Sequence, residues 1–449
     1  MIQNTVTRAG YIFGNITARY CFRAAILLPV ALFVSGAAFA QEPQPSAPLA
    51  GPLTQALQPF VDEHKAAGFV VLVADKDKVL DREPIGYSSL ANKTPMKADD
   101  LFWIASMTKS FTATALMMLV DEGKIGGIND PVEKYLPEFK GQKVVDEKDP
   151  THTPQQAAHP ITIKEILSHT SGIAIQQQFT KKQYEEGDNV HLKREVADYA
   201  ALPLRFQPGT KSEYNNAGFN TAGRIIEVVS GMTYADFMQK RLLDPLGLKD
   251  TVWWPSPEQA ERLAFSVKPG ADKQTLEDIN QYTDKNKAGI DGLVVRELGN
   301  VSTIPPNILR TGGISAIFTY KAHYAMPAGG LYSTAADVAK FCRMILNGGV
   351  CNGKRYLSEN AIRQMTTDYA GHLYPNHDSG YGQGWHLKLT SKDYPSAGSF
   401  GHRGAAGTHM WIDPKTQLVM VLLMQQGENK NEEAMYQAFL KAAIQKYGK

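Results

Sequence analysis

Residues 69–74 are FVVLVA, an apolar run rich in β-branched valine that is closed by the polar segment 75–78 (DKDK). Such a run, followed by a polar turn, predicts a buried strand that enters a hairpin. A second run, residues 418–424 (LVMVLLM), lies near the other end of the chain and is continuously apolar. Continuous apolar residues are typical of a strand covered on both faces. We therefore expect the two ends of the chain to meet in one sheet.

The segments around these two runs extend the pattern. A helical pattern covers residues 53–66, and residues 399–412 predict a further strand that the turn 413–416 joins to the last one. A closing helix places three apolar residues on one face, namely Met435, Phe439 and Ala442. Residues 101–120 predict a long apolar helix that follows a loop and ends near Gly123.

The middle of the chain predicts helices. Three pairs have the spacing of a helix-capping box: Thr162 with Glu165, Thr233 with Asp236, and Thr334 with Asp337. Two polar insertions, 137–160 and 268–311, show no clear pattern and can be flexible or form pocket walls. The expected fold is an antiparallel sheet flanked by helices, with a helical lobe inserted between the N- and C-terminal strands. The α/β lobe covers about 53–125 and 330–449, and the helical lobe about 126–329.

The first forty residues predict a secretory signal peptide. A cationic stretch precedes the apolar run 24–34 (AAILLPVALFV), and residues 38–40 (AFA) match a cleavage site. Cleavage would leave a Pro-rich linker, 41–52, before the main domain, 53–449. The apolar run is shorter than the roughly 20 residues that span a bilayer, although a retained anchor is the alternative. We expect a periplasmic or secreted protein without a stable membrane anchor after processing.

The charge of the mature chain argues against polyanionic partners. The formal net charge is +2, and the loss of the three arginines in the first forty residues leaves −1. Neither nucleic acid nor an anionic membrane surface is therefore expected as a partner. Of three cysteines, Cys21 lies in the signal segment. Cys342 and Cys351 can form a disulfide in an oxidising compartment, but Cys342 also fits the apolar face of a helix as a buried thiol.

Residues 106–109 (SMTK) are the first motif that can support chemistry. On a helix, positions i and i+3 share a face, so the Lys109 amine can reach the Ser106 hydroxyl. A serine hydroxyl becomes a good nucleophile when a nearby base takes its proton, and burial can lower the pKa of a lysine enough for that role. The apolar residues on both sides of the motif predict such burial. The alternative is a helix-capping serine with a surface lysine.

Residues 214–216 (YNN) supply a candidate second base. The phenol of Tyr214, beside an ammonium group, can lose its proton near neutral pH, and the amide of Asn216 can orient Lys109 or a substrate carbonyl. Residues 374–376 (YPN) have the same spacing but lie in a polar stretch that predicts a surface loop. Tyr214 directly precedes an apolar helix, which is a firmer scaffold for a site. We therefore favour Tyr214 over Tyr374.

Residues 402–405 (HRGA) lie within the predicted strand near the end of the chain. Small residues such as Gly404 allow another chain or a ligand to approach the backbone closely. The Ala405 N–H can pair with the Ser106 N–H as an oxyanion hole. A glycine-rich strand corner is the alternative interpretation of this segment.

In this order the three motifs resemble the serine β-lactamase and penicillin-binding-protein superfamily. S-x-x-K on a buried helix is followed by Y-x-N about a hundred residues later and by a basic-x-G strand near the end. The resemblance covers about residue 53 to the C-terminus and is strongest for the class C-like branch, which includes S-x-x-K carboxylesterases and D-aminopeptidases. Three other segments agree with it, namely 167–172 (LSHTSG), 206–210 (FQPGT) and 328–331 (AGGL).

The resemblance implies an α/β lobe and an all-α lobe with the site between them. It also implies acyl transfer through a Ser106 ester, with Lys109 and Tyr214 sharing the proton transfers, and substrate contacts from Asn216, Gly404, Ala405 and residue 402. The β-lactamase pattern has Lys-Thr/Ser-Gly at the third motif, whereas this chain has a histidine at position 402. Since that lysine and hydroxyl help to bind the β-lactam carboxylate, this departure argues against strong β-lactamase activity.

The esterase branch tolerates histidine at that place, so the expected substrates are esters first, then β-lactams, then D-amino-acid or other small peptides. A catalytically silent cell-envelope binding protein with the same fold is the alternative from a different class. No G-x-S-x-G, H-E-x-x-H, P-loop or dinucleotide fingerprint occurs, and the eleven histidines show no ligand spacing. We therefore expect neither a metal nor a cofactor, and the sequence predicts no particular oligomeric state.

Overall fold

The chain divides into two units, Met1–Leu49 and Ala50–Lys449, and all residues described below belong to the second. The computed structural model describes residues 51–145, 153–174, 192–270, 275–278, 325–375, 377–391, 394–427 and 429–448. The predicted signal peptide, nearly all of the linker, residues 146–152 of the first polar insertion and most of the second lie outside the described residues. Within the described ranges, no helix is long and apolar enough to cross a membrane.

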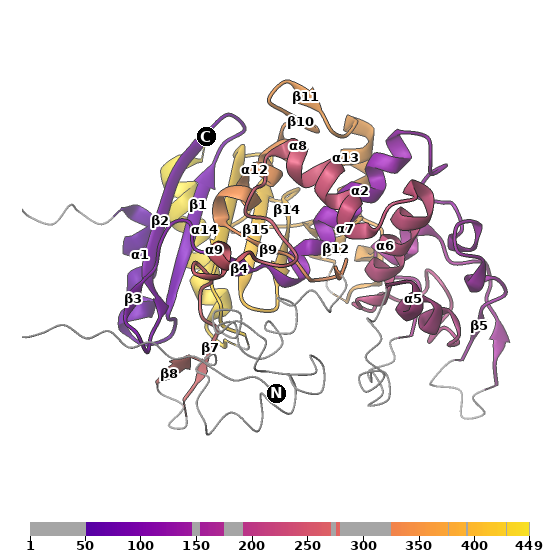
Figure 1. The fold of residues 1–449 in the computed structure, drawn as a ribbon, viewed down its shortest axis with the longest axis horizontal. Helices are drawn as coiled ribbons and strands as arrows, with labels where there is room; N and C mark the ends of the chain where they lie inside the picture. The colour runs from indigo at the N-terminus through magenta and orange to yellow at the C-terminus, as the bar shows by residue number, and fades with distance from the viewer. Residues whose placement is uncertain are drawn as a thin grey trace, which may run out of the picture. The chain divides into compact units, whose positions relative to one another are not determined.

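An eight-stranded antiparallel sheet forms the centre of the fold, in the order β12-β13-β14-β15-β16-β1-β2-β3 (Figure 1). Strand β1 (Gly68–Ala74) pairs with β16 (Leu418–Leu423), as expected from the two apolar runs. The two ends of the chain thus supply adjacent central strands. The other strands are β2 (Val79–Ser89), β3 (Thr94–Pro95), β12 (Ser379–Tyr381), β13 (His386–Lys388), β14 (Phe400–Gly404) and β15 (Thr408–Asp413).

Both faces of the central strands are buried because side chains of a strand alternate between its two faces. Phe69, Val71 and Val73 of β1 pack with the helices α1 (Pro52–Asp62) and α14 (Glu432–Tyr447). Val70 and Leu72 belong instead to the larger core on the opposite face, where α12 (Ala335–Leu346) contacts β1, β15 and β16. All seven residues of β1 are buried, which explains its continuously apolar sequence.

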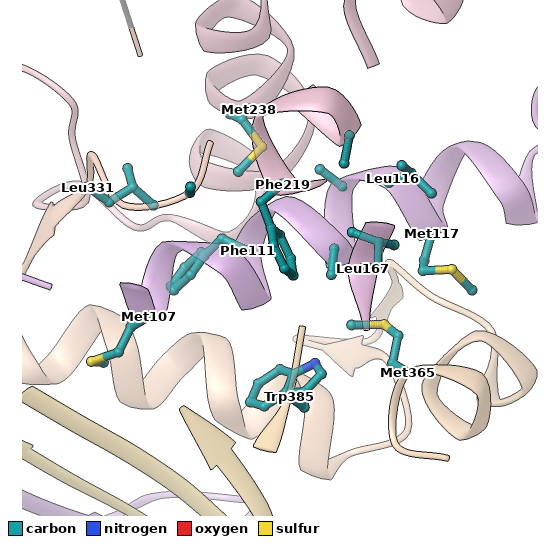
Figure 2. Packing of buried hydrophobic residues seen from close by; sticks show 14 of the residues in the cluster. Met107, Phe111, Leu116, Met117, Leu167, Phe219, Met238, Leu331, Met365 and Trp385 are labelled. Atoms are coloured by element: carbon teal, nitrogen blue, oxygen red, sulfur yellow. The ribbon is translucent and has the colours of Figure 1, made fainter. Parts of the chain in front are cut away.

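Helix α2 (Thr108–Asp121) runs through the larger core and is buried on every side up to Leu119. A helix surrounded by protein needs no polar stripe, and apart from Lys109 its buried residues are apolar or small. Figure 2 shows Phe111 of α2 in the core cluster that also contains Phe219 and Trp385, which come from distant parts of the chain. Helix α2 contacts α6 (Ala217–Ser230) and α13 (Glu359–Met365). Helix α6 in turn contacts α3 (Ile163–Leu167), α5 (Leu192–Ala200) and α7 (Tyr234–Met238).

The helix predicted for residues 101–120 begins later than expected. Strand β4 (Phe102–Trp103) pairs with β9 (Tyr332–Ser333), and a 3₁₀ turn at Ala105–Met107 leads into α2. Ala105 has a φ of +45°, a left-handed conformation that interrupts a regular helix at this point. Periodicity could not reveal this break, because the first residues are as apolar as the helix that follows.

The strand predicted for residues 399–412 is a hairpin. β14 ends at Gly404, residues 405–407 form a turn, and β15 begins at Thr408. Gly407 has a φ of +78°, which glycine adopts without a steric cost. The prediction missed this turn because its residues, Ala405, Ala406 and Gly407, are small and include no Pro, Asn or Asp.

The helix ends agree with the capping patterns. Thr162 and Glu165 form both hydrogen bonds of a capping box, and the side chains of Thr233 and Thr334 accept from the N–H groups of Asp236 and Asp337. Two expectations were off by a few residues. The first helix ends at Asp62 instead of residue 66, and α14 buries Ala443 more fully than Ala442.

Candidate active site

Ser106 and Lys109 lie where the 3₁₀ turn meets α2, with the Lys109 Nζ 3.1 Å from the Ser106 Oγ. Lys109 is completely buried, whereas Ser106 is partly exposed. The alternative of a capping serine with a surface lysine is therefore wrong. The left-handed residue just before the serine, Ala105, is a strained conformation of the kind that clusters at functional sites.

Two further acceptors hold the Lys109 amine. Its Nζ lies 2.8 Å from Asn216 Oδ1 and 2.7 Å from the carbonyl oxygen of Ala328. A free amine has two N–H bonds and one lone pair. When Asn216 and Ala328 take the two N–H bonds, the lone pair is left for the hydroxyl proton of Ser106. The geometry thus suits a lysine that removes a proton from the serine.

Burial lowers the pKa of Lys109 from its ordinary 10.5 to about 7. No carboxylate contributes to this shift, so the loss of solvation dominates. The Nζ also lies 4.9 Å from the ring centre of Tyr214 and 5.7 Å from that of Phe219. At neutral pH a substantial fraction of the amine is therefore uncharged and able to act as a base.

Tyr214 comes just before α6, and its hydroxyl is near enough to Ser106 for that side chain to influence the pKa of the phenol. The pKa of the phenol is raised to about 12, mainly because the protein displaces water around the hydroxyl; the Ser106 hydrogen bond and the Arg403 charge oppose this rise. Tyr214 is therefore protonated at neutral pH, contrary to the expected phenolate. Lys109 is therefore the candidate base beside Ser106, and Tyr214 is suited to donate or relay a proton.

The competing tyrosine, Tyr374, does not lie on a loop remote from the site, because it contacts the segment that precedes Tyr214. Its hydroxyl accepts a hydrogen bond from Ser212 Oγ at 3.3 Å. Ser212 lies two residues before Tyr214 in the sequence. Within the described ranges, no hydrogen bond links Tyr374 to Ser106 or Lys109. Asn376 of the same motif lies outside the described residues. Of the two tyrosines, Tyr214 is the one that reaches the nucleophile.

The hairpin β14–β15 packs against the segment that carries Ser106. A Cβ at Gly404 would lie 2.5 Å from the Ile104 carbonyl oxygen and 2.3 Å from Thr408 Oγ1, so only glycine fits there without a shift. Ala405 is the first residue of the turn that follows. Among the described residues, neither the Ser106 N–H nor the Ala405 N–H has a hydrogen-bond acceptor. These two N–H groups lie on contacting segments and are the candidate donors of the predicted oxyanion hole.

His402 lies beneath the site, with an exposed fraction of 1%. Its Nδ1 pairs with the Arg403 carbonyl oxygen at 2.8 Å and its Nε2 with the Tyr381 hydroxyl at 2.9 Å. Burial is the main reason that the pKa of His402 lies well below its usual range, so the ring is neutral. Both nitrogens are occupied, and the side chain therefore supports the wall of the site instead of facing a substrate as expected.

Sequence reasoning did not find the ring cluster behind Tyr214. Tyr381 joins His169 and His386, with ring centres 4.6 and 4.8 Å away, and His386 lies 4.7 Å from His402. Burial lowers the pKa of all three imidazoles, that of His386 to about 4. The part of the chain that the structure describes has no group of three side chains arranged to hold a metal. These histidines are scattered in the sequence, so no spacing could have revealed the cluster.

The Ala328 carbonyl is the other group that the sequence did not indicate. Its segment was noted as agreeing with the family pattern, but a backbone oxygen leaves no signature of its own in a sequence. Three hydrogen bonds fix this segment beside α2: Ala328 N–H donates to Asn220 Oδ1, Leu331 N–H to Thr108 Oγ1, and Thr112 Oγ1 to the Pro327 carbonyl. The acceptor for Lys109 is thus held in place from two helices.

Cys342 and Cys351, for which the sequence left a disulfide and free thiols open, are both free thiols. Cys342 is buried, with its Sγ 3.7 Å from Met410 Sδ, and Cys351 is partly exposed.

Comparisons with known proteins agree with this geometry. The family model described as Beta-lactamase matches residues 53–444. Penicillin-binding protein 4 of Amycolatopsis lactamdurans is 30% identical over 335 residues, which cover 73% of each chain. Lovastatin esterase of Penicillium rubens is 33% identical over 210 residues, or 44% of this chain and 51% of that one.

Solved structures share the fold. EstCE1, a hydrolase with promiscuous acyltransferase activity, superposes with a TM-score of 0.67 at 20% sequence identity, covering 87% of this chain and 97% of that chain. The large antiparallel sheet with flanking helices is therefore a β-lactamase/transpeptidase-like fold, as expected from the sequence.

Proposed function

Because this chain belongs to the Beta-lactamase family of serine hydrolases, we propose that it hydrolyses small carboxylic esters through a covalent acyl-enzyme on Ser106. One observation carries the proposal. The amine of Lys109 is fully buried, has a pKa lowered to about 7, and is held so that its lone pair can meet the Ser106 hydroxyl. A binding protein without catalysis has no need for such a costly buried amine.

In the acylation step, the Ser106 Oγ attacks the ester carbonyl while its proton moves to Lys109 Nζ. The carbonyl oxygen becomes negative and is bound by the N–H groups of Ser106 and Ala405. When the tetrahedral intermediate collapses, the C–O bond to the alcohol breaks. The leaving alkoxide takes a proton from the Tyr214 hydroxyl, and Lys109 returns its proton to the tyrosine.

In the deacylation step, water attacks the Ser106 ester. Tyr214 accepts a proton from this water as its own proton passes to Lys109, so the phenol need not ionise in the resting site. The intermediate then releases the acid, and Ser106 Oγ regains a proton from Lys109. Each cycle thus consumes one ester and one water and restores every group.

The third motif supports esters as the substrate class. The family position for a cationic lysine holds His402, which is buried and neutral with both ring nitrogens occupied. A substrate carboxylate therefore finds no charge from this residue. An uncharged ester has no such requirement, and the relatives include a protein named lovastatin esterase.

A β-lactam or a small D-amino-acid peptide is the second candidate, because Arg403 lies near the site. Its guanidinium is close enough to Tyr214 to oppose the rise in the pKa of that phenol, and its side chain is 69% exposed. It can therefore meet a substrate carboxylate. The carboxylate of Glu432, 3.9 Å away, partly offsets its charge.

Initial rates of the purified protein on two chromogenic substrates test the choice. We expect a short-chain nitrophenyl ester to be cleaved with a kcat/KM at least about 100-fold above that for a chromogenic cephalosporin, because the buried His402 provides no cation for the carboxylate. Arg403→Gln is the matched variant, and it should leave the ester rate unchanged. Faster cephalosporin turnover that is lost in Arg403→Gln would show that the second candidate is correct.

A pair of tyrosine variants separates the two Y-x-N motifs. Tyr214→Phe should lower kcat by about 10²- to 10³-fold, since the proton relay to the leaving group is removed while the ring stays. Tyr374→Phe should change kcat by less than about threefold, because its hydroxyl contacts only the rim at Ser212. Steady-state rates with the nitrophenyl ester measure both. A large loss of kcat in Tyr374→Phe together with a small loss in Tyr214→Phe would contradict the assignment of Tyr214 as the proton relay.

We also propose that the protein is exported and processed after Ala40. The support is the order of a cationic stretch, an apolar run and a small-x-small site in the first forty residues. Expression of the full chain in a bacterial host should give a protein in the periplasm or medium that begins at Gln41, as measured by intact mass. A cell-associated protein with residues 1–40 still attached would show that the segment is a retained anchor.

A further inference from the structure

His169 is bound to the backbone on both sides of Tyr214. The Glu213 N–H donates to the His169 carbonyl oxygen at 2.9 Å, and the Asn215 N–H donates to His169 Nδ1 at 3.3 Å. The ring of His169 also packs against the Tyr214 ring, with centres 4.3 Å apart. One residue thus contacts Tyr214 and both of its chain neighbours.

The conformation of His169 supports a specific role. Its φ is +62°, which is uncommon for a residue other than glycine, and such residues cluster at functional sites. The surrounding chain holds this bend: Thr170 N–H donates to the Glu165 carbonyl, and Gly209 N–H to the Thr170 carbonyl. The side chain of His169 is almost fully buried.

The protonation of His169 follows from its contacts. Nδ1 accepts from Asn215, so the proton of the neutral ring is on Nε2. A charged ring would place an N–H against the Asn215 N–H. Burial, aided by the nearby Lys109 and His386, holds the pKa of His169 well below its usual range, so the accepting nitrogen is retained. The Nε2 has no hydrogen-bond partner among the described residues.

Tyr214 needs such support because about half of it, 49%, is exposed. A side chain at the protein surface can rotate into water, and ordering it costs conformational entropy. Among the described residues, Ser106 is the only side chain whose hydrogen bonding influences the pKa of the Tyr214 hydroxyl. The ring contact and the two backbone bonds from His169 restrict both the side chain and the segment that carries it.

We propose that His169 is a positioning residue for the hydrolysis, holding the Tyr214 hydroxyl toward Ser106. The inference rests on the proposed function. The competing explanation is that His169 only stabilises the fold. The two differ in one respect: a residue that acts through Tyr214 loses its effect on the rate once the Tyr214 hydroxyl is absent.

Two substitutions separate the contacts of His169. In His169→Asn, the amide oxygen takes the place of Nδ1, and asparagine tolerates the left-handed backbone, so the Asn215 bond can remain while the ring contact is lost. His169→Phe keeps a ring but removes the acceptor. Each is made alone and together with Tyr214→Phe. Thermal melting checks that each protein is folded.

The measured quantities are kcat and KM for the ester and the rate at which a fluorophosphonate probe labels Ser106. We expect His169→Phe to lower kcat and the labelling rate by about 10- to 100-fold with little change in KM, as for a misplaced catalytic group. His169→Asn should lower kcat and the labelling rate by less than His169→Phe does, because its amide oxygen can still accept from the Asn215 N–H. In the Tyr214→Phe background, His169→Phe should cost less than about threefold, since coupled residues are not additive.

Equal losses in both backgrounds, or wild-type rates in folded His169→Phe, would overturn the inference. If His169→Phe does not fold, His169→Gln replaces it in the same double-mutant cycle with Tyr214→Phe. The amide of this glutamine lies one bond too far from the backbone to accept from the Asn215 N–H. Wild-type protein that is not labelled at all would refute the proposed function itself. Normal wild-type labelling with an additive cycle would refute only the role of His169.

Discussion

Ser106→Ala is expected to lower kcat/KM for the ester by at least about 10⁴-fold and to abolish labelling by a fluorophosphonate probe, because no covalent acyl-enzyme can form without the Oγ. The residual rate should come only from the oxyanion-binding N–H groups and from substrate binding. The fold should be intact, since the Ser106 side chain is partly exposed and its loss opens no large cavity.

The next serine in α2 provides the matched control. Ser110 is buried one turn after Ser106, and its Oγ donates to the Gly384 carbonyl at 2.7 Å. Ser110→Ala should cost about 1 kcal/mol of unfolding free energy through the lost hydrogen bond, yet leave labelling at the wild-type level. Mass spectrometry of the labelled peptide identifies the modified serine. A label on any other residue, or persistent labelling of Ser106→Ala, would show that the nucleophile lies elsewhere.

Lys109→Met should lower kcat by about 10³-fold, because general base catalysis typically contributes 10²- to 10⁴-fold and no other base contacts Ser106 among the described residues. Two effects on stability oppose each other. The buried amine no longer has to be desolvated, but Asn216 Oδ1 and the Ala328 carbonyl lose their donor. The unfolding free energy should therefore change by no more than about 2 kcal/mol.

Lys124→Met is the control for this variant, since Lys124 lies just beyond the end of α2 and is exposed. It should retain wild-type rates. Chemical denaturation of both variants reports the unfolding free energy. Wild-type turnover by a folded Lys109→Met protein would show that another group accepts the Ser106 proton.

The lowered pKa of Lys109 also sets the pH dependence of wild-type activity. The active form is the free amine, so kcat/KM should rise with pH, with a midpoint at about 7, and then level off. At pH 5 the rate should be about 100-fold below the plateau, since only about 1% of the amine is free there. Tyr214 acts in its protonated form, and with a pKa near 12 it should cause no decline below about pH 10. A flat profile between pH 5 and 9 would contradict the assignment of Lys109 as the base.

Several features followed from the sequence because they depend on nearby residues. The spacing of Ser106 and Lys109 is a property of one helical turn, and the 3.1 Å contact agrees with it. The apolar runs 69–74 and 418–424 predicted two strands buried on both faces, and their pairing at the centre of the sheet follows from that burial. The motif order then indicated the family, which residues 53–444 match.

Other features depend on contacts between distant segments, so only the tertiary structure decided them. The break at Ala105 comes after β4, which pairs with the distant strand β9, and the turn after Gly404 lies where β14 packs against Ile104 and Ala105. Nothing in the local sequence distinguishes these two sites from a continuous helix or strand. The Ala328 carbonyl accepts from Lys109 of α2, and His169 accepts from the Asn215 N–H just before α6. Both contacts join segments that are far apart in the sequence.

The sequence by itself predicted the two central strands, the family and the candidate catalytic residues, since periodicity and motif spacing act over a few residues. The tertiary structure decided which of those residues is the base. Burial lowers the pKa of Lys109 to about 7, whereas the loss of water around the Tyr214 hydroxyl raises its pKa to about 12. Of the two residues that were expected to share the removal of the Ser106 proton, the lysine is therefore the one suited to act as the base. A pKa depends on the water that surrounding segments exclude, and that exclusion arises only when the chain is folded.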